Sequence, residues 1–71
     1  MQSISEESKK LGQNLKRIRM KKGISQNAIA KTLDIDRSFI TNIEGGKTNP
    51  TLATIAKLAK AIGVSVGELM K

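Results

Sequence analysis

The 71-residue sequence contains no cysteine and no histidine, and its single aromatic residue is Phe39. Without cysteine, the chain has neither a disulfide framework nor a thiolate metal site. The absence of both residue types argues against a zinc site and excludes a histidine-based catalytic triad. The remaining polar residues form no pattern typical of an acid–base pair or an activated nucleophile. We therefore expect no metal, no cofactor and no enzymatic activity.

Long apolar segments are also missing. No apolar run approaches the roughly 18 residues that a membrane-spanning helix needs. The first ten residues, MQSISEESKK, contain no apolar core of the kind found in signal peptides. We therefore expect a cytoplasmic protein with no membrane partner.

Acidic residues are scarce relative to basic ones. The chain has 13 Lys and Arg against 6 Asp and Glu, a formal charge of +7 and a pI near 10.2. Such a balance indicates an anionic partner, either nucleic acid or a membrane surface. A membrane-surface helix would need its apolar face exposed, yet Leu11, Leu15 and Ile18 are needed for a core, and tryptophan is absent. Nucleic acid is the favoured partner.

The periodicity of the apolar residues is helical throughout, which predicts an all-α fold in one domain spanning residues 1–71. A first helix is expected to end near Lys22, with either Ser3 or Ser5 as its N-terminal cap. Gly12 weakens the first turns by about 1 kcal/mol relative to alanine, which favours a later start near Leu11.

Four further helices are expected, at about residues 26–33, 37–44, 52–62 and 66–70. Their expected N-terminal caps are Ser25, Asp36, Thr51 and Ser65. Ser65 and Glu68 have the spacing of a capping box. The buried face of the fourth helix is expected to carry Leu52, Ile55, Ala59 and Ile62, which recur at three-four-three spacing.

Residues 26–45 have the pattern of a helix-turn-helix, a unit that places its second helix in the DNA major groove. Ile29 and Leu33 share one helical face, and Ile40 and Ile43 share another. Ile35 lies between the two helices, where an apolar side chain would fill their junction. Asp34 ends the first of them, because aspartate tolerates the left-handed conformation that a tight turn needs.

The stretch SQNAIAKTLDIDRSFITNIEGGKTNPTLATIAKLAKAIGVSVGEL resembles the Cro/repressor (XRE) family of helix-turn-helix proteins, over about residues 11–70. The resemblance implies a compact, lambda repressor-like bundle of five helices that binds DNA, usually as a homodimer. Within the family, DRSFITNIE is similar to restriction–modification controller proteins, although phage repressors, conjugative-element regulators and antitoxins share most of these residues. Two positions depart from the common pattern, Asp34 where glycine is frequent and Ala28 where glutamate is frequent.

The recognition helix, about 37–44, is expected to contact bases through its outward-facing polar residues Arg37, Ser38, Thr41 and Asn42. Arg37 is the strongest candidate, because a guanidinium reaches guanine O6 and N7 together. Contacts to the DNA backbone are expected from Gln26, Phe39, Lys47, Thr48, Asn49 and Arg17, mostly through the resemblance.

Several of these positions have a structural alternative. Phe39 is either a core residue or a neighbour of sugar and a thymine methyl, and Asn49 could instead shape the turn before Pro50. Arg17 could belong to a solvated face of the first helix. Asp36 is interpreted as a helix cap, rather than as a partner of Arg37 or of a cytosine amine.

Two further expectations come from the resemblance. Arg19 and Glu44 should form a partly buried ion pair that joins the first helix to the end of the third. The region of about residues 62–71 should form a two-fold interface through Val64, Val66, Leu69 and Met70, unless these residues only close the monomer core. A chain of 71 residues buries only about 60% of its unfolded surface, so association with a second copy would stabilise it.

Together these features predict a sequence-specific transcriptional regulator that binds a palindromic operator as a homodimer. The alternative is an antitoxin-type protein that binds a toxin and represses its own operon. Either would have double-stranded DNA as a partner, with RNA polymerase or a toxin as a second partner. The sequence indicates no pocket for a small-molecule effector.

Overall fold

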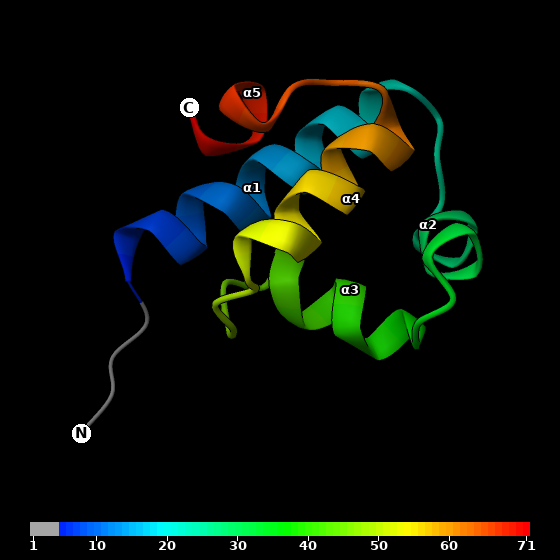
Figure 1. Ribbon diagram of the computed structural model, residues 1–71, viewed down its shortest axis with the longest axis horizontal. Helices are drawn as coiled ribbons and strands as arrows, with labels where there is room; N and C mark the ends of the chain where they lie inside the picture. Colours follow the sequence, from blue (N-terminus) through cyan, green and yellow to red (C-terminus); the bar gives the residue numbers. More distant parts are fainter. Residues whose placement is uncertain (1–4) are drawn as a thin grey trace.

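The computed structural model describes residues 5–71, in which every regular element is a helix (Figure 1). The helices are α1 (Glu6–Lys21), α2 (Gln26–Leu33), α3 (Arg37–Glu44), α4 (Leu52–Ile62) and α5 (Val66–Met70). This confirms the expected all-α fold of five helices.

Serine and threonine caps explain where most of these helices begin. The hydroxyl oxygens of Ser5, Ser25, Thr51 and Ser65 each accept a hydrogen bond from the backbone N–H three residues later. The capping box of α5 is complete. The helix α1 begins after Ser5, so the expected later start near Leu11 is wrong, and the alternative cap Ser3 lies outside the described residues.

The start of α3 is different. Asp36 occupies the N-cap position with extended backbone, but its carboxylate makes no capping hydrogen bond. The interpretation of Asp36 as a side-chain cap is therefore wrong. Asp34 has the expected left-handed conformation, with φ 58°, and ends α2.

The five helices share a core of leucine, isoleucine and alanine side chains. Its members are Leu11, Leu15, Ile18, Ile29, Ala30, Ile40, Ile43, Ile55, Leu58, Ala59, Ile62 and Leu69. Leu33 and Ile35 pack against it partly buried, as expected for the junction between α2 and α3. The buried position predicted for Leu52 is wrong, because its side chain is 71% exposed; Leu58 supplies the fully buried leucine of α4.

The close approach of α1 to the end of α3 explains Gly12. A Cβ atom at this position would lie 2.3 Å from the carbonyl oxygen of Ile43 and 2.8 Å from that of Glu44. Since only glycine fits there, the residue that weakens the α1 helix locally is required by the packing of α1 on α3.

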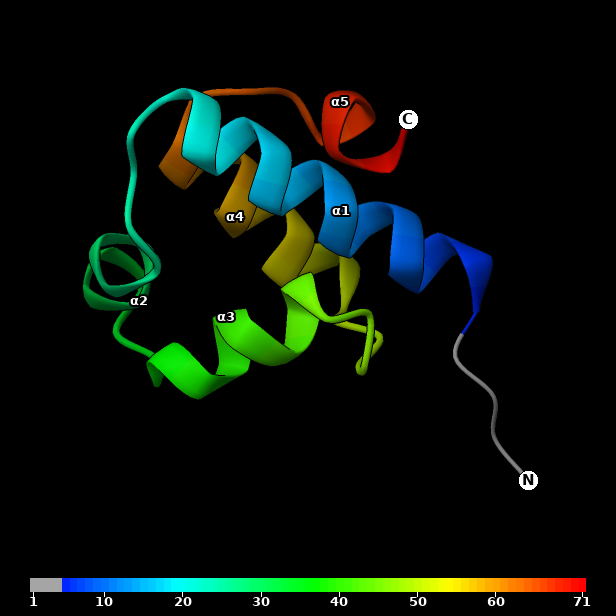
Figure 2. The ribbon, with the colours of Figure 1, turned by 180° about the vertical axis from the view of Figure 1, so that it is seen from behind.

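The packing places α3 and α5 on opposite sides of the molecule. In both views α5 lies at the top beside α1, and α3 lies at the bottom (Figures 1 and 2). The helix α2 stands at one end and contacts both α3 and α4. The recognition helix is therefore remote from the predicted dimerisation segment.

Candidate nucleic-acid interface

The side chains predicted to contact bases lie together on the outer face of α3. Arg37, Ser38, Thr41 and Asn42 are all exposed, and their spacing of three to four residues places them on adjacent turns. The opposite face of α3 carries Ile40 and Ile43, which are fully buried. The helix thus presents a continuous polar surface while its apolar face holds it to the core.

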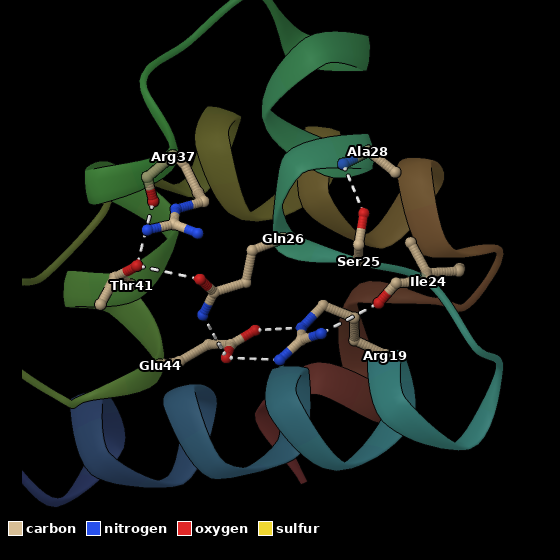
Figure 3. Close-up of polar contacts among 8 residues, drawn as sticks. All are labelled: Arg19, Ile24, Ser25, Gln26, Ala28, Arg37, Thr41 and Glu44. Atoms are coloured by element: carbon tan, nitrogen blue, oxygen red, sulfur yellow. Dashed lines mark hydrogen bonds and ion pairs between the residues drawn. The ribbon is translucent and has the colours of Figure 1, made fainter.

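A buried ion pair fixes the C-terminal end of α3. Arg19 Nε lies 2.6 Å from Glu44 Oε2, and Arg19 Nη2 donates to Glu44 Oε1 at 3.0 Å (Figure 3). The two side chains are only 12% and 4% exposed. Arg19 Nη1 also donates to the carbonyl oxygen of Ile24, at 2.9 Å. The expected pair is therefore present, and it joins α1, α3 and the loop before α2.

The ion pair continues into a polar network that links α2 and α3. Glu44 Oε1 accepts a second hydrogen bond from Gln26 Nε2, at 3.0 Å. Gln26 Oε1 in turn accepts from the Thr41 hydroxyl, also at 3.0 Å (Figure 3). Gln26, the first residue of α2, is thus oriented by side chains of α3. Sequence reasoning missed this link, because both partners were considered only as separate DNA contacts.

The loop after α3 is attached to the start of α1. Asn49 Oδ1 accepts hydrogen bonds from the hydroxyls of Ser8 and, at 3.4 Å, Ser5. Ser8 is 3% exposed, so this bond satisfies a buried hydroxyl. These contacts favour the structural alternative for Asn49. Lys47 is exposed, and its predicted phosphate contact stays a prediction.

One basic residue beside this loop was not singled out from the sequence. A Cβ atom on Gly46 would lie 3.3 Å from the Cα atom of Lys9. Lys9 is exposed and therefore adds a positive charge next to Lys47. Its position depends on how α1 meets the loop, and the sequence shows only a lysine-rich helix face.

Arg17 is not brought together with the other predicted DNA contacts. It lines a groove of about 400 Å³ between α1 and the C-terminal segment. The other residues of this groove are Ile18, Lys21, Lys22, Val64, Glu68 and Lys71. The neighbouring Asn14 donates to the carbonyl oxygen of Leu69 at 2.8 Å, which confirms that this side of α1 faces α5. The arrangement favours the alternative in which Arg17, which is exposed, belongs to a solvated face of α1.

Two carboxylates, those of Asp34 and Asp36, lie beside the N-terminal end of α3. An open groove of about 630 Å³ is lined by Asp34, Ile35, Asp36, Ser38, Phe39 and Asn42. Phe39 is partly buried against the core but also lines this groove, so both of its alternatives stay open. Phosphates would be repelled at this end of α3 and attracted at its C-terminal end, beside which Lys47 and Lys9 lie.

The predicted dimerisation residues have unequal exposure. Leu69 is fully buried in the core, so its side chain offers no surface to a second copy. For Leu69 the alternative of closing the monomer core is the one observed. Val64, Val66 and Met70 are only partly buried, and an interface through them stays a prediction.

Residues 5–71 contain no metal site and no membrane-spanning helix of the following kinds. No group of three or more His, Cys, Asp or Glu residues is placed to hold a metal ion within that range. None of the described helices is long and apolar enough to cross a bilayer.

Comparison with known proteins gives consistent matches. Residues 15–69 match the helix-turn-helix family. The control protein C.MunI of Mycoplasma sp is 34% identical, over 84% of this chain and 82% of that protein. The crystal structure of the restriction-modification controller protein C.AhdI from Aeromonas hydrophila is 39% identical, with a TM-score of 0.82, over 87% of this chain and 94% of that one.

A third similar protein has been solved in complex with DNA. The structure of the controller protein C.Esp1396I, solved as a tetramer with its natural 35 base-pair operator, is 28% identical with a TM-score of 0.79. It covers 94% of this chain and 99% of that one. The chain belongs to the helix-turn-helix family of DNA-binding transcriptional regulators, of the Cro/repressor type.

Proposed function

We propose that this chain reads a palindromic operator as a homodimer, with α3 in the major groove of each half-site. The observation that carries the proposal is the outer face of α3. Arg37, Ser38, Thr41 and Asn42 are exposed there on a helix whose other end is fixed by the buried pair of Arg19 and Glu44. Side chains on a fixed helix can read base edges in one register.

The charges around α3 support one orientation on the duplex. Lys47 and Lys9 lie at the loop beside the C-terminal end of α3, while Asp34 and Asp36 lie beside its N-terminal end. We propose that the loop after α3 faces a phosphate strand of the DNA. Asp34 and Asp36 would then lie over the open major groove. Gln26, at the start of α2, would bind a phosphate through the amide N–H that Glu44 does not use.

The proposed interface between two copies uses Val64, Val66 and Met70. These partly buried apolar residues lie on the α5 side, away from α3, so pairing there would leave both recognition helices free. A dimer of this kind reads half-sites about 34 Å apart. The C.Esp1396I tetramer with its operator supports this reading of DNA by associated copies.

The regulated system is proposed to be a set of restriction–modification genes. Controller proteins recur among the similar proteins, including C.MunI, C.BamHI of Bacillus amyloliquefaciens and C.AhdI. The segment DRSFITNIE consists of Asp36 and the recognition helix α3. It resembles the corresponding segment of controller proteins.

Selection of duplexes from a random library, at about 0.15 M salt, tests the proposal. Two inverted half-sites spaced near one helical turn would support it. Retained salt-sensitive binding with no recovered motif would contradict it, because the basic surface would then hold DNA without reading it.

Sedimentation of a Met70→Glu variant tests the interface. This variant should sediment as a monomer where the wild type forms dimers, and Leu52→Glu, at an exposed position of α4, should not change the dimer. An unchanged profile for Met70→Glu would place the interface elsewhere. A Leu69→Glu variant is unsuitable, because it would place a charge in the monomer core.

A further inference from the structure

The network around Gln26 determines which hydrogen-bonding groups α3 can offer to DNA. It runs from Arg19 to Glu44, then to Gln26 and finally to Thr41 (Figure 3). Each hydrogen bond in the network has a fixed direction, because the Arg19 guanidinium, at its start, can only donate. The inference below rests on the proposed function and specifies how one of its base-contacting residues acts.

Glu44 sets the direction at the first step. Both of its oxygens accept hydrogen bonds from the Arg19 guanidinium, and an ionised carboxylate has no proton to donate. The contact between Glu44 Oε1 and the Gln26 side chain must therefore use the amide nitrogen of Gln26 as donor. This leaves the amide oxygen of Gln26 pointing toward Thr41.

The direction at the second step follows. Gln26 Oε1 can only accept, so in its 3.0 Å hydrogen bond with the Thr41 hydroxyl the donor is Thr41. The other neighbour of this hydroxyl, the carbonyl oxygen of Arg37 at 3.3 Å, is also only an acceptor. Whichever of the two receives the proton, the single hydroxyl proton of Thr41 is used inside the protein.

We propose that Thr41 reads DNA as a hydrogen-bond acceptor and selects a base that carries an exocyclic amine, adenine or cytosine. With its proton engaged, the exposed hydroxyl offers only an oxygen lone pair and the neighbouring methyl group to the major groove. Adenine N6 and cytosine N4 donate in that groove, whereas guanine and thymine present acceptors at the corresponding positions. Phosphate oxygens are acceptors too, so Thr41 does not bind the DNA backbone.

Gln26 thereby becomes a positioning residue for base reading, in addition to its proposed phosphate contact. It conveys the fixed orientation of the buried ion pair to an exposed side chain on the recognition helix. A threonine hydroxyl alone rotates and bonds either donors or acceptors. The network removes that ambiguity.

The hydrogen bonds can be tested in the free protein by NMR, with the variant Thr41→Val. The Gln26 side-chain carbonyl carbon should shift to lower frequency when its donor is lost, while the amide proton held by Glu44 stays downfield. Thr32→Val, the same change at an exposed threonine of α2, should move neither signal. A shift of the amide proton without a shift of the carbonyl carbon would show the opposite orientation and overturn the proposal.

The base preference can be tested by duplex selection with wild type, Thr41→Val and Thr41→Ser. One position of each half-site should favour adenine or cytosine, and Thr41→Val should reduce that preference about fivefold. Thr41→Ser, which keeps the acceptor, should retain it. Preference for guanine or thymine at that position, or a uniform loss of affinity across sequences, would overturn the proposal.

The two measurements separate the possible failures. If the wild type selects no sequence, the proposed function fails together with base reading by Thr41, whatever the NMR result. If the wild type selects an operator and Thr41→Val leaves its base preferences unchanged, only the role of Thr41 fails.

Discussion

The two ends of the recognition helix differ in how they are held. At the C-terminal end, Ile43 is fully buried and the Glu44 side chain is 4% exposed and bonded to Arg19. At the N-terminal end, Arg37 and Ser38 are exposed, and the Asp36 carboxylate makes no capping bond. One end is thus determined by the fold, whereas the other is available to a ligand.

This difference indicates how a small bundle supports DNA reading. The fixed end sets the angle and register of α3 through backbone packing on Gly12 and through the ion pair. Substitutions there should affect the free energy of unfolding. Substitutions at the free end should affect DNA binding with little effect on folding.

The largest effect is expected for Glu44→Ala. Removing the carboxylate leaves the Arg19 guanidinium buried without its partner, which should lower the free energy of unfolding by about 3–5 kcal/mol. A chain of this size has a total of roughly 4–10 kcal/mol, so a large loss of folded protein is expected on mild heating. Urea denaturation measures the change.

Glu7→Ala is the matched control, because Glu7 is an exposed glutamate in the first turn of α1. It should change stability by less than about 0.5 kcal/mol. Equal midpoints for the Glu7 and Glu44 variants would contradict the structural role of the ion pair.

Gly12→Ala should destabilise the protein by about 3 kcal/mol. The added methyl group would meet the carbonyl oxygens of Ile43 and Glu44, so α1 and α3 must separate. Gly67→Ala in α5 is a control, since its nearest neighbour, Ser65 Oγ, lies 3.7 Å from the added Cβ. Thermal unfolding should show a lower midpoint for the first variant and an equal or higher one for the second. A tolerated Gly12→Ala would mean that the helices are less closely packed.

Arg37→Ala should have the reverse effect, weakening DNA recognition while leaving the stability of the fold almost unchanged. Losing a bidentate guanine contact reduces discrimination between operator and mutated operator by roughly 1–3 kcal/mol. Stability should change by less than about 0.5 kcal/mol, because Arg37 is exposed. Titration of labelled duplexes measures the first quantity and urea denaturation the second. Unchanged selectivity would remove Arg37 from base reading.

The residues of the core and the residues of the functional surface also differ in how well the sequence predicts them. The boundaries of α2 to α5 and most of the core follow from local periodicity and caps, so they were predicted closely. Leu52 fits the helical spacing as well as Leu58 does, but it lies at the first turn of α4, and only the packing of the bundle shows that nothing covers it.

The functional surface was predicted as a set of residue types rather than as an arrangement. The outward face of α3 follows from its period, and the partners Arg19 and Glu44 came from the family resemblance. The bond between Gln26 and Thr41 depends on the crossing of two helices and on side-chain rotamers. Neither is encoded in spacing along the chain.

The smallest effects should come from the residues at the two N-cap positions of the helix-turn-helix, Ser25 and Asp36. Ser25→Ala removes a 2.9 Å hydrogen bond to the backbone N–H of Ala28 and should lower stability by about 1 kcal/mol. Asp36→Ala removes no such bond and should change stability by only a few tenths of a kcal/mol, through its charge near the start of α3. The same variant should bind DNA more tightly, since a carboxylate that repels the negatively charged duplex is lost. Equal losses of stability for the two variants, measured in urea, would show that the free end of α3 is capped in solution as firmly as α2.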